Sequence, residues 1–109
     1  MDTRDMQKEV DDYINQFKTG YFSPLGQLAR LTEEVGELAR EISHNYGEKQ
    51  KKPEEAEKKL EEELGDVLFV IITLANSLEI DLSKAFEITM NKFNTRDRDR
   101  FERIDDESI

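Results

Sequence analysis

Two short acidic segments of the sequence have the same order of residue types. EEVGEL occupies residues 33–38 and EELGDV occupies residues 62–67. Both contain two acids, an aliphatic residue, a glycine, a third acid and a second aliphatic residue. Side chains three positions apart lie on one face of a helix, so each segment presents a pair of carboxylates if it is helical. The two pairs are Glu34 with Glu37 and Glu63 with Asp66.

A helical projection shows how these acids lie relative to the apolar side chains of their segments. At about 100° per residue, Glu34 lies roughly 70° and Glu37 roughly 130° from the centre of the apolar stripe. In the second segment, Glu63 lies about 75° and Asp66 about 135° from the corresponding centre, in the same sense. If the two helices pack antiparallel, equal offsets place all four carboxylates on the same side of the pair. We therefore predict that the two pairs of acids face each other.

Such a group of carboxylates has a definite chemistry. Four carboxylates at close range repel one another unless they take up protons or bind cations. Oxygen ligands without cysteine or a histidine pair favour Mg²⁺ or Mn²⁺ over Zn²⁺. Gly36 and Gly65, which each cost about 1 kcal/mol relative to alanine in a helix, then leave room for a close helix approach or a ligand. The alternative is a solvated acidic face, because the chain has 26 acidic residues.

A second metal motif is weaker. Glu41 and His44 form an E-x-x-H sequence, which occurs in di-iron carboxylate bundles. Those sites need two such motifs, and His44 is the only histidine of the chain. We therefore expect His44 at the surface or at a helix end, without a catalytic role.

Four amphipathic helices are predicted to carry these residues, at about 3–18, 24–46, 53–78 and 82–96. Asp2 or Thr3, Ser23 before Pro24, and Asp81 are suitable residues for helix starts, and Pro53 suits a first turn. No strand-like alternation competes, so the predicted fold is an all-α four-helix bundle with antiparallel helices. The run at 68–78 is the segment expected to be most buried. The predicted core stripes of the two acidic helices are Leu28, Leu31, Val35, Leu38 and Ile42, and Leu60, Leu64, Val67 and Ile71.

Length and charge limit the remaining possibilities. The 109 residues predict a single domain over 1–109, with a charged tail from about residue 97 that orders only against a partner or substrate. With 16 basic and 26 acidic residues, the formal net charge of -10 argues against nucleic acid or an anionic membrane as partner. There is no cysteine and no apolar run near the roughly 20 residues that span a bilayer. We expect a soluble, cytoplasmic protein.

The segment EEVGELAREI, followed by EELGDVLFVIITLA, resembles the E-E-x-x-E and E-x-x-D motifs of the MazG-like all-α nucleoside triphosphate pyrophosphohydrolases. The likeness extends from about Tyr21 to Phe101 and includes FSPLGQLARLTEE upstream and NKFNTR downstream. It implies hydrolysis of a nucleoside triphosphate between the α and β phosphates, giving monophosphate and pyrophosphate. It also implies that one acid, Glu33 or Glu37, orients the attacking water. The Mg²⁺ ligands that it implies are Glu34, Glu37, Glu63 and Asp66, with Glu33 assisting.

The resemblance also suggests residues that contact the substrate. Lys92 and Arg96 are four positions apart and resemble the family's downstream basic pair, which would bind the phosphates. They are otherwise a solvated basic edge. Phe22 would stack on the base and Asn76 would read one of its polar edges. Packing roles are equally open for both: Phe22 as a staple at the helix start, and Asn76 as a partner for backbone groups in the core.

The resemblance implies a homodimer or a dimer of dimers, and the apolar third helix favours a homo-oligomer independently. A role in removing non-canonical or surplus nucleotides would suit such an enzyme. Two other functions remain open from the sequence. One is a catalytically silent helical bundle that serves in oligomerisation or regulation, and the other is a related pyrophosphohydrolase acting on dUTP or phosphoribosyl-ATP.

Overall fold

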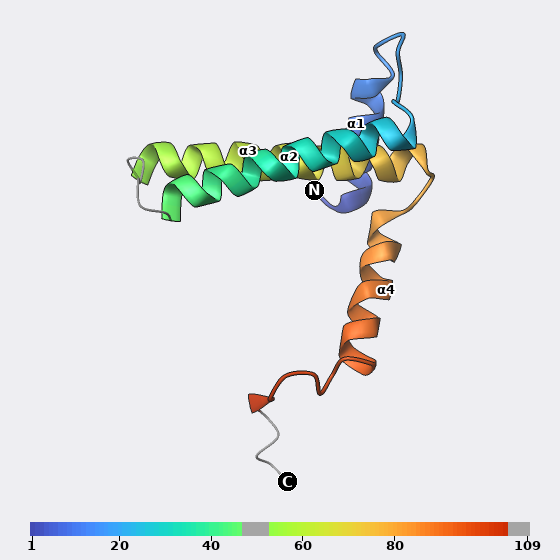
Figure 1. Cartoon of the computed structure of the whole chain (residues 1–109). Coiled ribbons are helices and arrows are strands. Elements are labelled where there is room, and N and C mark those ends of the chain that lie inside the picture. Colours follow the sequence, from blue (N-terminus) through green and yellow to red (C-terminus); the bar gives the residue numbers. More distant parts are fainter. Residues whose placement is uncertain (47–52, 105–109) are drawn as a thin grey trace.

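The computed structural model describes residues 1–46 and 53–104, with side chains from Lys59 onward in the second range. The helices are α1 (Thr3–Ile14), α2 (Pro24–Tyr46), α3 (Pro53–Ser77) and α4 (Leu82–Thr95), and no strand occurs in the described residues (Figure 1). The all-α prediction is therefore confirmed. None of the described helices is long and apolar enough to cross a membrane. Residues 47–52, which follow the predicted end of the second helix at about residue 46, and the last five residues of the predicted tail lie outside the described ranges.

The helices begin where the sequence predicts. Asp2 caps α1 in a reciprocal capping box with Asp5. Ser23 Oγ accepts a hydrogen bond from Gly26 N at 3.1 Å, just before α2, and Asp81 caps α4 through Ser83 N. The first helix is shorter than predicted, because the chain turns out of the α-helical pattern after Ile14. These starts depend on short-range hydrogen bonds that the local sequence encodes.

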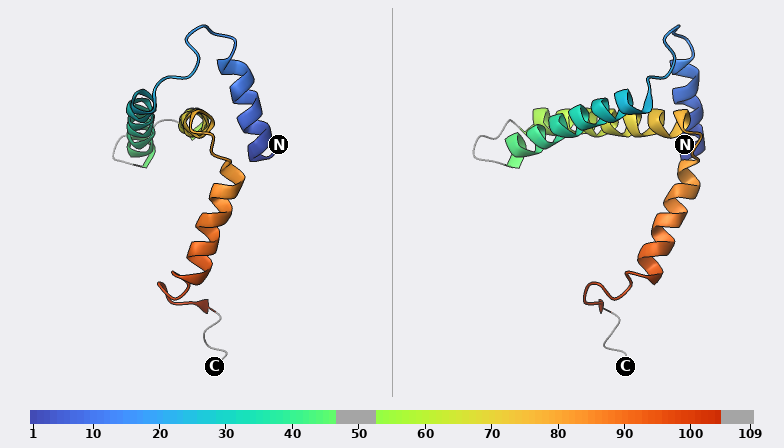
Figure 2. Two further views of the ribbon diagram at one scale, coloured as in Figure 1. Left: turned by 90° about the vertical axis from the view of Figure 1, so that its right-hand side faces the viewer. Right: turned by 45° about the vertical axis from the view of Figure 1, so that its right-hand side comes forward.

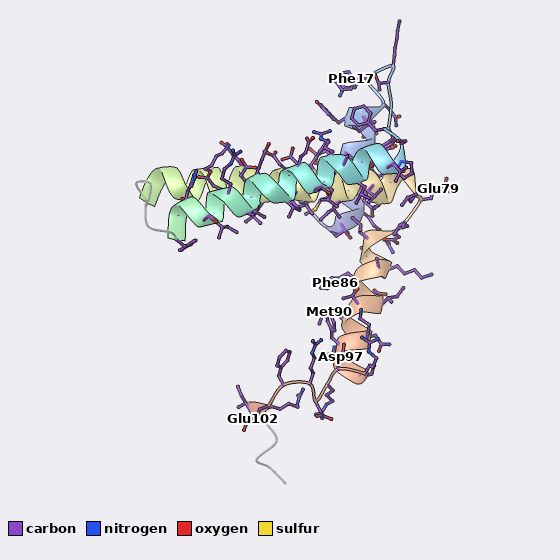
Figure 3. The ribbon with its side chains drawn as sticks, in the orientation of Figure 1. Phe17, Glu79, Phe86, Met90, Asp97 and Glu102 are labelled. Carbon is purple, nitrogen blue, oxygen red and sulfur yellow. The ribbon has the colours of Figure 1, made fainter. Side chains whose placement is uncertain are left out.

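α2 and α3 lie side by side and antiparallel, α1 crosses α3, and α4 leads away from the pair (Figures 1 and 2). The radius of gyration is 18.1 Å, whereas a compact domain of this length would have about 13 Å. A single copy of the chain is therefore an extended molecule. Phe86 and Met90 project from α4, and none of the other described elements lies beside them (Figure 3).

The predicted core stripe of the helix pair is not the buried core of a single copy, because five of its nine side chains are exposed and the other four are half-buried. α2 meets α3 through its polar flank, on which Gln27, Glu41 and Asn45 are buried. The apolar side chains on the other side of both helices are 39–56% exposed, and we call them the outer apolar face: Leu28, Val35 and Ile42 of α2, and Leu64 and Ile71 of α3. Two helices have too little surface to bury a stripe that faces away from their contact. A third layer is needed to cover it.

The prediction for the apolar run of α3 holds in part. Val70, Ile72, Thr73 and Ala75 are buried, and three of them form most of the small apolar core. Ile71, which lies on another side of the same helix, and Leu78, which follows its last residue, are exposed. Burial in this run therefore follows the side of the helix that meets α1 and α2.

A glutamine of α1 sets the direction in which α4 leaves α3. Gln7 Nε2 donates to Asn76 Oδ1 at 2.9 Å and to Ile80 O at 2.8 Å. Gln7 Oε1 accepts a hydrogen bond from Leu82 N at 3.0 Å, and Asn76 Nδ2 donates to Gln7 O at 2.9 Å. One side chain therefore joins α1, the end of α3 and the first residue of α4. The outward direction of α4 is fixed by these bonds.

Candidate metal and substrate site

Three carboxylates meet between α2 and α3. Glu34, Glu37 and Glu63 each offer one oxygen, and these oxygens all lie within 4.8 Å of one another. Glu63 is only 3% exposed, Glu34 is half-buried and Glu37 is exposed. The antiparallel pairing brings the acids together, as the matching offsets on the two helices predict. We call these three residues the acidic cluster.

Two oxygens of the cluster have no hydrogen-bond partner among the described residues. Glu34 Oε2 and Glu63 Oε2 are buried and make no hydrogen bond to any described residue. A buried, unsatisfied polar group costs about 1–3 kcal/mol, and more if it is charged. The cluster therefore has unused capacity to bind a cation, and its oxygen-only donor set suits a hard divalent ion.

The electrostatics of Glu34 reflect this arrangement. Burial, followed by the charges of Glu37 and Asp66, raises the pKa of Glu34, and Glu63 adds to the effect. Arg30 acts in the opposite direction. Asp66 is exposed and lies outside the three-residue ligand set. The fourth predicted ligand is thus close enough to act on Glu34 by charge, but the structure does not bring it to ligand distance.

The raised pKa of Glu34 predicts a pH effect in the metal-free protein. The folded-state pKa of Glu34 lies above the ordinary value of 4.5. In the window of pH between these two values, the folded protein holds a proton that the unfolded chain has lost. Stability therefore falls as the pH rises through this window and stays lower above it. We expect metal-free Glu34→Gln to melt at a higher temperature than wild type at pH 7. The difference should disappear well below pH 4.5, and thermal melts in EDTA across this range would measure it. A Glu34→Gln protein that is less stable than wild type at pH 7 would contradict the assignment.

Lys59 also contacts the cluster, and the sequence did not single it out. Its Nζ forms an ion pair with Glu63 Oε1 at 2.8 Å, from the preceding turn of α3. The hydrogen bond to Glu63 raises the pKa of Lys59. The Lys-x-x-x-Glu spacing was the available signal. It was not informative by itself, because such spacings are common in a chain with 39% charged residues.

A pocket of about 290 Å³ lies against the first turns of α2, before the acidic cluster along the helix. Its volume is near the lower end of the size range of ligand pockets, about 300–1,000 Å³. Its wall includes Tyr13, Phe17, Phe22, Gln27, Arg30 and Thr73. Arg30 precedes Glu34 by one helical turn, and its guanidinium lies 5.7 Å from the centre of the Phe69 ring. The pocket and the acidic cluster are therefore neighbours along α2. Phe22, the predicted base-stacking residue, is half-exposed in this wall.

Gln27 is a second polar residue that the sequence did not single out. It is 2% exposed, and its Nε2 donates to Phe22 O at 2.6 Å and to Ser77 Oγ at 2.9 Å. These bonds tie the start of α2 to the end of α3. The residue therefore fixes the alignment of the two helices on which the acidic cluster depends.

The other predicted substrate residues lie apart from the acidic cluster of their own chain. Asn76 does not line this pocket. It is hydrogen-bonded to Gln7, and its Nδ2 also donates to Tyr21 Oη at 3.0 Å. These contacts match the packing role that the sequence left open. Lys92 Nζ lies 5.0 Å from the centre of the Phe93 ring, and Arg96 pairs with Asp97 at 3.1 Å. Asp97 marks the far end of α4, well away from the helix pair (Figure 3).

Glu33 and His44 are exposed residues of α2 outside the three-residue ligand set. His44 lies in the last turn of the helix, as expected for a residue at a helix end. Glu33 points away from the contact with α3 by its helical position. Of the two acids suggested as water-orienting, only Glu37 belongs to the acidic cluster.

Known proteins resemble this chain over most of its length. The family described as the MazG nucleotide pyrophosphohydrolase domain matches residues 22–101. Protein YpjD of Bacillus subtilis (strain 168) is 64% identical over 100 residues, which are 92% of this chain and 90% of that protein. The solved structure of a Bacillus-conserved MazG protein, a nucleotide pyrophosphohydrolase, has a TM-score of 0.77 at 64% identity, covering 91% of this chain and 96% of that chain. A solved structure of YPJD from Bacillus subtilis has a TM-score of 0.81 at 62% identity, covering 87% and 97%.

Proposed function

Because this chain belongs to the MazG family of nucleotide pyrophosphohydrolases, we propose that it hydrolyses nucleoside or deoxynucleoside triphosphates between the α and β phosphates. The products would be the nucleoside monophosphate and pyrophosphate. The observation that carries the proposal is the acidic cluster, in which three carboxylates converge and two buried oxygens have no described partner. A role in removing surplus or non-canonical nucleotides would follow from this reaction.

The metal in this proposal is Mg²⁺, with Mn²⁺ as a substitute. Glu34, Glu37 and Glu63 would hold it, and Asp66 would join them by a side-chain movement at the rim. When bound, such an ion neutralises phosphate charge and makes a water more acidic. The carboxylate of Glu37, which is exposed at the edge of the cluster, would orient the attacking water and accept its proton. Glu33, on the adjacent exposed surface, would assist from the rim.

The nucleobase of the substrate would occupy the pocket beside the cluster. Phe22 offers an exposed ring for stacking at one wall. Arg30 stands between this pocket and Glu34 on α2, where its charge is available to a phosphate. A nucleotide would thus lie along α2, with its base toward the start of the helix and its phosphates at the acids.

A second copy of the chain is part of the proposal. The outer apolar face of α2 and α3 is uncovered in one copy, and a second helix pair laid on it would complete a four-helix bundle. Lys92 and Arg96 are carried away from their own acidic cluster by α4 (Figures 1 and 2). We therefore place them at the phosphates of another copy, in a homodimer or a dimer of dimers.

The proposed reaction predicts a definite pair of products. A panel of canonical and modified triphosphates, with dUTP included, should release pyrophosphate and monophosphate in equal amounts with Mg²⁺, and EDTA should abolish the release. Chromatographic identification of both products measures the position of cleavage. Release of diphosphate and inorganic phosphate would instead show cleavage between the β and γ phosphates and refute the proposal. Turnover of phosphoribosyl-ATP alone would assign a different substrate to the same site.

A further inference from the structure

Lys59 contacts the acidic cluster in a way that the proposed reaction does not use. Its Nζ lies 2.8 Å from Glu63 Oε1. The other oxygen of the same carboxylate, Oε2, is buried without a described partner. Lys59 therefore neutralises Glu63 through one oxygen, while the carboxylate remains part of the cluster with Glu34 and Glu37.

Helix stabilisation does not account for this ion pair. A lysine that precedes a glutamate by four residues has the less favourable order for a helical pair. The lysine side chain is 45% exposed but the glutamate side chain is only 4% exposed, so this is not one of the exposed helical pairs that contribute little to stability. A comparable pair occurs on α1, where Lys8 Nζ lies 3.0 Å from Asp12 Oδ2 and both side chains are well exposed. What distinguishes the Lys59 pair is its buried acid.

Lys59 is not the only group that positions Glu63. The Glu63 side chain is 4% exposed, so the packing of α3 against α2 already restricts it. What Lys59 adds to the site is a positive charge beside acids that otherwise repel one another. A buried carboxylate without such a charge is strongly unfavourable.

We propose that Lys59 is the counter-cation of the metal-free acidic cluster, and that its charge weakens the binding of the divalent ion that replaces it. The proposal rests on the metal site proposed above. A lysine at this position would keep the empty cluster folded and the ion exchangeable. Removing its charge should have two linked effects, a less stable metal-free protein and a tighter metal site.

The expected size of the second effect follows from Coulomb's law. For a unit charge roughly 6 Å from a divalent ion, at an effective dielectric between those of a protein surface and water, affinity changes on the order of tenfold or more. Relief of the unpaired Glu63 by the ion acts in the same direction. Both contributions predict that the variant binds the ion more tightly than wild type.

Lys59→Met is the informative variant, because it keeps the apolar stem of the side chain and removes the charge. Mn²⁺ alone serves as the probe, with the free ion measured by electron paramagnetic resonance after the protein has been freed of metal. We expect the Kd of Lys59→Met for Mn²⁺ to be about tenfold lower than that of wild type, and its metal-free melting temperature to be lower. Lys59→Arg should match wild type. Lys8→Met, which breaks the comparable pair on α1, should leave Mn²⁺ affinity unchanged.

Each outcome decides a different point. Equal or weaker Mn²⁺ binding by Lys59→Met, with normal binding by wild type, would overturn the role of Lys59 and leave the metal site intact. Absence of Mn²⁺ binding by wild type would instead refute the proposed metal site. A Lys59→Met protein that folds only with Mn²⁺, as followed by circular dichroism, is the extreme form of the expected result. One that stays unfolded with Mn²⁺ would overturn the proposal.

Discussion

Replacement of Glu63 by glutamine is expected to abolish pyrophosphate release, with a loss of at least about a hundredfold in kcat/KM. Loss of a mere outer-shell partner of a metal costs about 10–100-fold, and Glu63 is proposed as a direct ligand. It is also the most buried acid of the cluster, at 3% exposure, so solvent offers no substitute ligand in its place. Glutamine has the same shape but only one acceptor oxygen and no charge. The variant should therefore keep the helices and lose the ion.

The measurement needs a control for the general loss of an acid from α3. Glu62→Gln removes the adjacent carboxylate, which is exposed and lies outside the cluster. It should retain nearly full activity and full Mg²⁺ stabilisation in a thermal melt. Glu63→Gln should show neither, although its metal-free far-ultraviolet circular dichroism should match wild type. Full activity in Glu63→Gln would show that the acidic cluster is not the metal site.

Ile71→Glu is expected to dissociate the oligomer. Ile71 is 39% exposed in one copy and lies on the outer apolar face of α3. If a second helix pair covers this face, the new carboxylate would be buried without a partner, which costs several kcal/mol. A cost of about 3 kcal/mol raises the dissociation constant roughly a hundredfold. Activity should fall with assembly, because Lys92 and Arg96 would no longer reach the cluster of another copy.

Light scattering coupled to size-exclusion chromatography, over a range of protein concentrations, would measure this effect. Leu25→Glu is the matched control, because Leu25 is an apolar residue of α2 that is 78% exposed and lies outside the outer apolar face. It should leave the mass in solution unchanged. A wild-type protein that is monomeric at all concentrations, or an Ile71→Glu protein that assembles normally, would refute the proposed interface.

Much of the local structure could be predicted from the sequence because short-range interactions determine it. Asp2, Ser23 and Asp81 precede helices that begin where these residues can cap them. The convergence of Glu34, Glu37 and Glu63 was also predictable. Equal offsets on two helices need only one tertiary fact, the antiparallel pairing, to bring the acids together.

The tertiary structure alone decided which side of each helix meets which neighbour. The periodicity of α2 and α3 identified an apolar stripe, but Leu28 and Ile71 on that stripe are exposed while Gln27 and Glu63 beside it are buried. Periodicity shows that a stripe must be covered and does not show whether the same chain or another covers it.

The sequence by itself thus determined the helices, their caps and the pair of acids on each helix, since each depends on residues a few positions apart. The direction of α4, the pairing of Lys59 with the buried Glu63, and the tie between Gln27 and Ser77 were decided only by the tertiary structure. The direction of α4 and the Gln27–Ser77 tie depend on contacts between residues that are far apart in sequence. Lys59 and Glu63 are close in sequence, but the burial that gives their pairing its importance comes from α2 packing on α3. The physical reason is that helical periodicity specifies the faces of a helix, whereas long-range packing selects the partner of each face.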